Sequence, residues 1–138
     1  GTEPKPIAKV ASGGELSRIS LAIAISTSQL GQAPTLIFDE IDSGIGGAVA
    51  DAVGRVMRAL GRDRQVLAVT HLAQVAARGD THLVVTKQRN KAGTTSHIRS
   101  VATDERVDEI ARMLGGEHLS ATSRAHALEM IAGGSDER

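Results

Sequence analysis

Residues 35–40 read Thr-Leu-Ile-Phe-Asp-Glu, and residues 65–71 read Gln-Val-Leu-Ala-Val-Thr-His. Each segment is a short apolar run that ends in polar side chains. Continuous apolar runs of this kind are typical of parallel strands that are covered on both faces. Between them, apolar residues recur at helical intervals from Ile45 to Leu60, which predicts a helix that ends at Gly61. The order strand, helix, strand indicates an α/β fold with a parallel sheet and a right-handed crossover.

The rest of the chain adds helices and a hairpin to this parallel sheet. Apolar residues on more than one side predict a largely buried helix over residues 14–30. Two strand-like runs joined by a polar segment, residues 88–94, predict a hairpin at a sheet edge. We expect one domain over residues 1–132 and a disordered tail over residues 133–138. Within the domain we expect these further elements: a short helix 72–78, strands 82–87 and 96–102, and helices 104–114 and 120–132.

Composition excludes several classes of protein. The chain has 138 residues and a formal net charge of zero, which argues against a polybasic segment whose main task is neutralising nucleic-acid phosphate. It has no cysteine, so a disulfide framework, a thiolate metal site and a thiol nucleophile are excluded. Phe38 is the only aromatic residue, which excludes a base-stacking platform. Without a membrane-spanning run or signal peptide, we expect a cytoplasmic protein with no membrane partner. Since no Met opens the chain, we also expect it to be a piece of something longer.

A first candidate site is Ser12-Gly13-Gly14-Glu15, at the start of the predicted helix. In one interpretation this is a capping box, in which Ser12 caps the helix and Glu15 reaches back to it. In the other it is an anion site. The two glycines allow backbone N–H groups to approach a phosphate, the hydroxyl adds a donor, and the helix dipole favours negative charge.

A second candidate site is the acidic pair Asp39-Glu40. Ligands bind at the carboxyl ends of the strands in open α/β sheets. Asp39 suits coordination of Mg²⁺, which prefers hard oxygen ligands, and Glu40 suits the orientation or deprotonation of an attacking water. The alternative is a strand end that runs into a solvated acidic turn.

The third candidate is His71, which follows the second strand. If the two strands are neighbours, His71 lies at the same sheet edge as Asp39 and Glu40, where its ring can contact a phosphate oxygen. The alternative is an ordinary structural or surface histidine. The other four histidines have no such placement, and we interpret them as structural or solvated.

Taken together, the three sites resemble the motifs of ABC-type ATPases. In chain order, residues 12–15 match the signature motif, residues 36–40 the Walker B strand, and His71 the switch histidine. Asp-Glu-Ile-Asp at residues 39–42 is similar to the SMC-like branch, because transporter ATPases usually carry Pro-Thr after Asp-Glu. The resemblance implies a partial P-loop NTPase fold of the ABC/SMC head type, with packed helices and an edge hairpin.

Within that branch the chain resembles the RecN family of bacterial DNA-repair ATPases. The resemblance covers nearly the whole chain and is carried by these runs: 9–22, 38–47, 69–77, 109–116 and 125–130. It implies an ATPase that acts in recombinational repair of DNA double-strand breaks, in the cytoplasm and at the nucleoid during repair. DNA is then a partner of the full-length protein.

Two features depart from the wider pattern. Gly46 stands where many relatives carry a D-loop Asp, so a role of that Asp cannot be transferred; the glycine-rich form agrees with RecN. None of the 15 glycines is followed by Lys, so the chain has no Walker A loop for the β- and γ-phosphates. We therefore expect the C-terminal half of a head, inactive alone, whose partner is the N-terminal half that carries Walker A.

The resemblance also implies the role of each site residue. Two heads sandwich two ATP molecules, with Asp39 serving Mg²⁺, Glu40 positioning the attacking water and His71 contacting the γ-phosphate. Ser12, Gly13 and Gly14, with Glu15 orienting their loop, donate to the γ-phosphate in the partner head.

Two alternative functions remain open. One is the head of another SMC-like or ABC ATPase. The other is a non-catalytic engagement or DNA-contact module, for which the basic hairpin residues Lys87, Arg89 and Lys91 are the best feature. Charges on a hairpin are also common where they discourage sheet-to-sheet aggregation.

Overall fold

The structure is a computed structural model with an α/β fold. It describes the following residues: 19, 22–23, 26–27, 33–39, 42, 44–90, 93–115 and 119–135. The chain divides into two compact units, Gly1–Val75 and Ala76–Arg138. The single domain over residues 1–132 stays a prediction. Each unit has buried apolar residues of its own.

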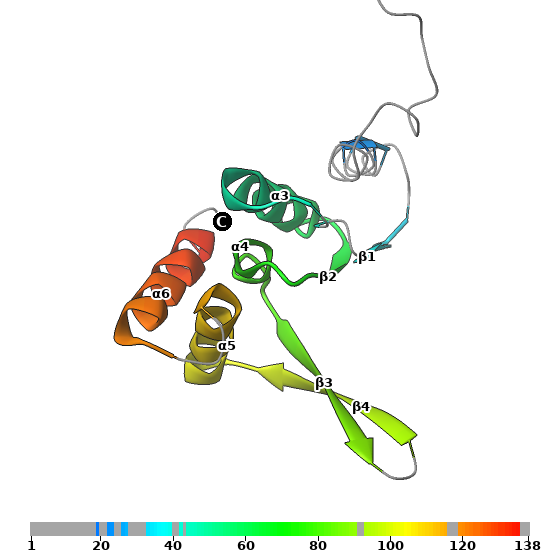
Figure 1. The fold of residues 1–138 in the computed structure, drawn as a ribbon. Coiled ribbons are helices and arrows are strands. Elements are labelled where there is room, and N and C mark those ends of the chain that lie inside the picture. Colours follow the sequence, from blue (N-terminus) through cyan, green and yellow to red (C-terminus); the bar gives the residue numbers. More distant parts are fainter. Residues whose placement is uncertain are drawn as a thin grey trace, which may run out of the picture. The chain divides into compact units, whose positions relative to one another are not determined.

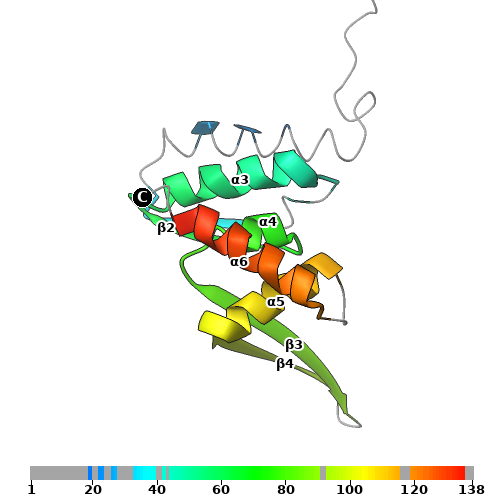
Figure 2. The same cartoon turned by 90° about the vertical axis from the view of Figure 1, so that its left-hand side faces the viewer.

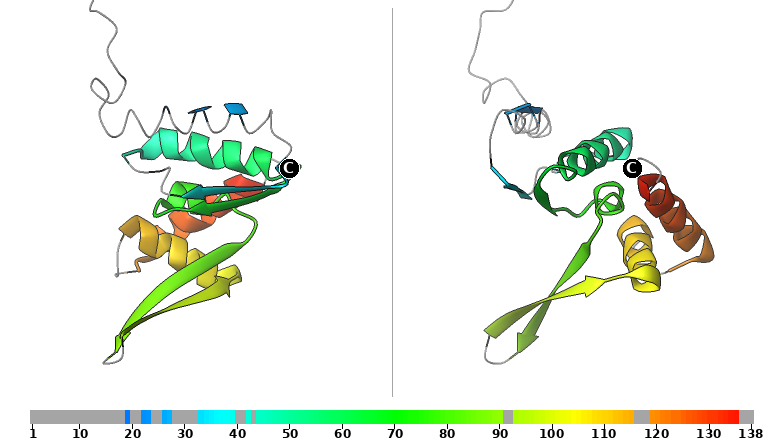
Figure 3. Two further views of the ribbon diagram at one scale, coloured as in Figure 1. Left: turned by 90° about the vertical axis from the view of Figure 1, so that its right-hand side faces the viewer. Right: turned by 180° about the vertical axis from the view of Figure 1, so that it is seen from behind.

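A parallel pair of strands forms the sheet of the first unit. Strand β1 (Thr35–Asp39) pairs with β2 (Gln65–Val69) in a register that runs from Thr35 opposite Gln65 to Asp39 opposite Val69. Helix α3 (Gly47–Leu60) connects the two strands and lies along one face of the pair (Figure 3). The strand–helix–strand arrangement predicted from the apolar runs is confirmed.

Helix α3 buries a single face against the sheet. Its buried residues Ala50, Val53, Met57 and Leu60 follow one another at intervals of three and four, so they share a face of the helix. They pack with Phe38 of β1 in one apolar cluster. The backbone N–H of Gly61 donates to the carbonyls of Met57 and Arg58 at 3.0 and 3.1 Å, which ends the helix where the sequence predicted.

The opposite face of the strand pair is exposed, which corrects the expectation that both faces are covered. Ile37 is 71% exposed, whereas its neighbour Phe38 is 6% exposed. Leu67 and Val69 are exposed as well. Successive strand residues point to opposite faces, and α3 covers only the face of Phe38. The unbroken apolar run therefore predicted the strand correctly, but it does not reveal that only one face of the strand is buried.

The predicted helix over residues 14–30 is described at only five positions. Ile19, Ala22, Ile23, Ser26 and Thr27 are helical. Ile19 and Ile23 are exposed, although we expected a largely buried helix. The other three described residues of this helix are exposed as well.

The second unit contains an antiparallel hairpin and two helices (Figure 1). Strand β3 (His82–Asn90) pairs with β4 (Gly93–Val101), and both are longer than the sequence predicted. Polar residues that we assigned to the connection, such as Gln88 opposite Thr95, continue the ladder. Backbone hydrogen bonds hold the two strands together there, without any need for apolar side chains.

Helices α5 (Thr103–Gly115) and α6 (Ala121–Ser135) follow the hairpin and lie side by side (Figure 2). Val107, Ile110 and Ala111 form the buried face of α5. An ion pair joins Arg124 of α6 to Asp108 of α5. Helix α6 continues through residues 133–135, which we expected in the tail; residues 136–138 lie outside the described residues. The short helix predicted over residues 72–78 is α4 (Ala73–Ala76).

Candidate functional site

The carboxyl ends of β1 and β2 lie next to each other at one edge of the sheet. The register pairs Asp39, the last residue of β1, with Val69, the last residue of β2. Thr70 and His71 follow directly. Asp39 is exposed, and the side chain of His71 is 71% exposed. The condition that the two strands be neighbours is met, and both side chains are accessible at the edge where ligands bind in sheets of this kind.

Asp42 is a residue of this edge for which the sequence motifs predicted no role in the site. It is 2% exposed, although its side chain is a carboxylate. The hydroxyl of Thr70 donates to Asp42 Oδ2, and the backbone N–H of His71 donates to the same oxygen at 3.0 Å. A buried carboxylate is tolerated when it is hydrogen-bonded in this way. Asp42 thereby ties the loop after β1 to the segment after β2.

Thr70 completes this connection with a second hydrogen bond. Its Oγ1 accepts from the backbone N–H of Leu72 at 3.0 Å, while its own proton goes to Asp42. The sequence did contain a signal for this pair. Asp42 lies between Phe38 and Ile45, two apolar residues that pack in or against the core, and a carboxylate buried there needs hydrogen-bond donors.

Glycines shape the loop that leads from Asp42 into α3. Gly44 and Gly47 have positive φ angles of 73° and 53°, a region that favours glycine. The backbone N–H of Ile45 donates to the carbonyl of Asp42 at 3.2 Å, and the Ile45 side chain packs against the core. This tight turn holds the backbone of Asp42 at the edge of the sheet.

The other predicted site residues have no described geometry. Ser12, Gly13, Gly14, Glu15 and Glu40 lie outside the described residues. Their roles stay predictions, as do those of Asp39 and His71.

The donor set at this edge fits a magnesium ion that is shared with a phosphate. In the part of the chain that the structure describes, no group of three or more acidic or histidine side chains is placed to hold a metal alone. Mg²⁺ is typically bound through one or two carboxylates together with substrate phosphates and waters. Among the described residues, the exposed carboxylate of Asp39 suits that kind of binding.

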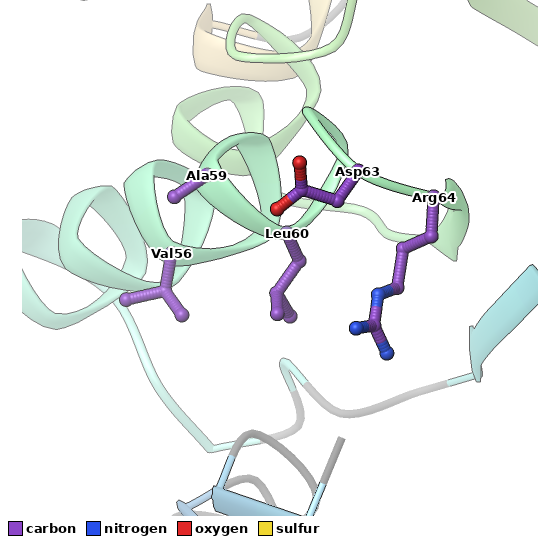
Figure 4. A pocket seen from close by; sticks show the side chains of 5 residues that line it. All are labelled: Val56, Ala59, Leu60, Asp63 and Arg64. Atoms are coloured by element: carbon purple, nitrogen blue, oxygen red, sulfur yellow. The ribbon is translucent and has the colours of Figure 1, made fainter. Parts of the chain in front are cut away.

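A cavity in the first unit lies away from this edge. It has a volume of about 300 Å³ and is lined by Val56, Ala59, Leu60, Asp63 and Arg64 (Figure 4). These residues belong to the end of α3 and the turn before β2, at the amino end of that strand. Because ligands of open α/β sheets bind at the carboxyl ends, we do not assign this cavity to the site.

The second unit carries a half-buried histidine beside charged residues of α5. Burial lowers the pKa of the His82 imidazole, and the charge of Arg106 lowers it further, against an opposite effect of Glu109. A hydrogen bond from Arg112 lowers the pKa of Glu109. His82 Nδ1 is buried and has no hydrogen-bond partner within the described residues. These groups lie at the base of the hairpin and on α5, so we interpret them as structural.

The hairpin also carries basic residues on one of its faces. Lys87 and Arg89 are both exposed and two residues apart on β3, so they point to the same side. Lys91, the third basic residue of the predicted cluster, lies outside the described residues.

In the described ranges, none of the helices has both the length and the hydropathy required to cross a membrane.

Comparison with known proteins shows a close similarity to DNA repair proteins. The chain is 53% identical over 131 residues to the DNA repair protein RecN of Xylella fastidiosa strain 9a5c, which covers 95% of this chain and 24% of that protein. It is 46% identical to the Treponema pallidum RecN over all 138 residues, and 50% identical to the Deinococcus radiodurans RecN over 133 residues. The chain thus spans about a quarter of the length of the curated relatives that it matches. No protein-family model matches it.

Solved structures show the same fold at lower sequence identity. A chain from a structural study of ATP-driven dimerization and DNA-stimulated activation of SMC ATPases superposes with a TM-score of 0.63 and 19% identity, over 86% of this chain and 70% of that one. The SMC head domain from Thermotoga maritima gives a TM-score of 0.55 and 24% identity, over 69% of this chain and 35% of that one. The predicted fold class is confirmed. In sequence this chain is therefore a relative of one segment of the RecN family of DNA repair proteins, and its fold is similar to part of an SMC head domain.

Proposed function

We propose that this chain is the C-terminal half of an ATPase head in a RecN-like protein, where ATP hydrolysis is coupled to engagement of two heads during recombinational repair of DNA double-strand breaks. The observation that carries the proposal is the edge formed by β1 and β2. There, an exposed carboxylate at the end of β1 and an exposed imidazole two residues after β2 lie at the ends of neighbouring parallel strands, in a chain that is similar to RecN over almost its whole length.

Three residues at the ends of the two strand segments have roles in this proposal. Asp39 holds the magnesium ion, Glu40 positions the attacking water as general base, and His71 contacts the γ-phosphate. The bound Mg²⁺·ATP supplies the phosphoryl group and the charge neutralisation that its hydrolysis requires. The N-terminal half of the same head supplies Walker A. Such a protein acts in the cytoplasm, at the nucleoid during repair.

The signature residues act in the site of the partner head. Ser12, Gly13 and Gly14 donate to the γ-phosphate that the partner binds, and Glu15 orients their loop. A glycine-rich helix start favours an anion, because N–H groups and the helix dipole point toward it. Each composite site therefore combines Walker B of one chain with the signature motif of another.

A mixing experiment in the complete protein tests this arrangement. Glu40→Gln keeps the shape of the side chain but removes the base, so we expect ATP hydrolysis to slow about 10²–10⁴-fold while binding persists. Ser12→Arg leaves Walker A and B intact, so we expect ordinary nucleotide binding by the monomer and failed engagement. A mixed dimer of the two variants contains one site with both lesions and one site with neither.

ATPase activity on mixing decides between the outcomes. Partial recovery supports composite sites, since only the mixed dimer has an intact one. If Ser12→Arg abolishes nucleotide binding by the monomer, Ser12 serves its own head or caps its helix, and the composite model is wrong. If Glu40→Gln hydrolyses ATP at the normal rate, the water is positioned by another residue.

A DNA-contact module is the second candidate function, because Lys87 and Arg89 share one exposed face of the hairpin. Salt-dependent DNA binding that is lost when these residues and Lys91 are changed to Gln supports it. DNA binding that survives these changes refutes it.

A further inference from the structure

The carboxylate of Asp42 contacts His71 in two ways. The backbone N–H of His71 donates to Oδ2 at 3.0 Å, and the ring atom Nδ1 lies 3.4 Å from the same oxygen. The Asp42 side chain is 3% exposed, whereas the His71 side chain is 71% exposed. One nitrogen of the ring thus faces a buried carboxyl group, while most of the side chain is open to solvent.

This arrangement constrains the ring of His71 chemically. Oδ2 of Asp42 already accepts two hydrogen bonds, so the ring nitrogen that faces it is better placed as an N–H donor than as a second acceptor. The partner of one ring nitrogen determines which nitrogen is protonated. When Nδ1 carries the proton, Nε2 is the ring atom that can contact a ligand. Nε2 accepts a hydrogen bond when the ring is neutral and donates one to a phosphate oxygen when the ring is doubly protonated.

We propose that Asp42 is a positioning residue that holds a proton on His71 Nδ1 and fixes the ring so that Nε2 is presented at the carboxyl edge of β1 and β2. Its consequence for catalysis rests on the proposed function, in which His71 contacts ATP. Its effect on the ring does not depend on ATP.

Through the same oxygen, Asp42 also contacts Thr70, the residue before His71. Asp42 lies three residues after Asp39, and its Oδ2 also accepts from the hydroxyl of Thr70. The loop that follows β1 and the segment that carries His71 are therefore held by one carboxylate oxygen. A displacement of either segment changes the placement of the His71 ring.

The first test reads the protonation of His71 without nucleotide. The complete protein, labelled with ¹⁵N-histidine, is examined by NMR at alkaline pH, and the His71 signals are identified by their loss in His71→Gln. We expect the neutral ring to carry its proton on Nδ1. In Asp42→Ala we expect this preference to be lost. If the alanine variant fails to fold, the isosteric Asp42→Asn replaces it, and we expect it to move the same signals in the same direction. A proton on Nε2 in the unaltered protein, or signals that no Asp42 variant changes, overturns the proposal.

The second test asks whether Asp42 acts on hydrolysis through His71. Replacement of a residue that orients a functional histidine typically costs about 10–100-fold in activity, so we expect kcat of Asp42→Asn to fall by that factor with little change in KM. In the His71→Gln background the same change should cost less than about twofold, because the group it orients is gone. Equal losses in both backgrounds mean a general structural role and refute the proposal.

Asp51→Asn is the matched control for this experiment. It makes the same chemical change on α3, in the same unit, at an exposed ion pair with Arg55, and should leave kcat unchanged. A complete protein without any ATPase activity refutes the proposed function. The NMR result still decides the proposal on Asp42 in that case.

Discussion

Arg106 joins α5 to the turn that follows α4, and its removal should loosen the second unit measurably. Its Nη2 donates to the carbonyl oxygens of Ala77 at 3.0 Å and Gly79 at 2.5 Å. From the other side, Arg78 in this turn donates to the carbonyl of Gly133 in α6 at 2.7 Å. The turn is thus held to both helices by hydrogen bonds from arginine to backbone carbonyls.

The size of the effect follows from the two bonds. A hydrogen bond that involves a charged group contributes about 1.5–3 kcal/mol. Because one nitrogen serves both carbonyls, we expect Arg106→Ala to cost about 2–3 kcal/mol rather than the sum of two independent bonds. Arg106→Lys retains a single charged donor and should lose about half as much. At about 1.4 kcal/mol for each tenfold change, the alanine variant should exchange its α5 amide protons roughly 30- to 150-fold faster.

Hydrogen exchange of α5 in the complete protein, read by mass spectrometry, measures this change. Glu105→Ala is the control, since Glu105 is on the same helix and makes an exposed pair with Arg99 of β4. Exposed pairs contribute less than about 1 kcal/mol, so the control should change exchange only slightly. Equal effects of the two alanine variants, or a lysine variant as damaged as the alanine variant, would show that the two carbonyl contacts do not stabilise the unit.

Two further predictions concern stability. The pKa of His82 is below 6.5 in the folded protein and about 6.5 in the unfolded chain. Between these two pKa values the unfolded chain binds more protons than the folded protein. The stability of β3 should therefore decrease as the pH falls through 6.5. Hydrogen exchange of β3 between about pH 5.5 and 7.5, corrected for the intrinsic rate, should show this slope, and His82→Gln should flatten it; an unchanged slope in that variant contradicts the assignment. Gly47→Ala should destabilise α3 by about 1–2 kcal/mol, because Gly47 has a φ of 53°. Gly46→Ala is its control, because Gly46 has an extended φ of −174° and space for a Cβ; similar exchange of α3 in both variants would contradict the strain argument.

The local pattern of residues predicts the elements of this protein well. The apolar runs before Asp39 and before Thr70 form β1 and β2. The residues before Gly61 whose apolar members recur at helical intervals form α3. These signals are reliable because each depends on neighbours in the chain: a pleat of two residues, a turn of 3.6, or a terminal glycine. The motif order also led to the right family relationship and to the fold.

Only the tertiary structure decided what these elements cover and which side chains meet. Ile37 and Phe38 are equally apolar neighbours in one run, yet only Phe38 is buried, because α3 packs on a single face of the sheet. Asp42 looks like one more acidic residue after Asp39 in the sequence, and 28 positions separate it from Thr70. Its contacts with Thr70 and His71 form only when the parallel register brings the two strand ends together. Composition and spacing describe each strand end alone, and the hydrogen bonds between them depend on the packing of the whole unit.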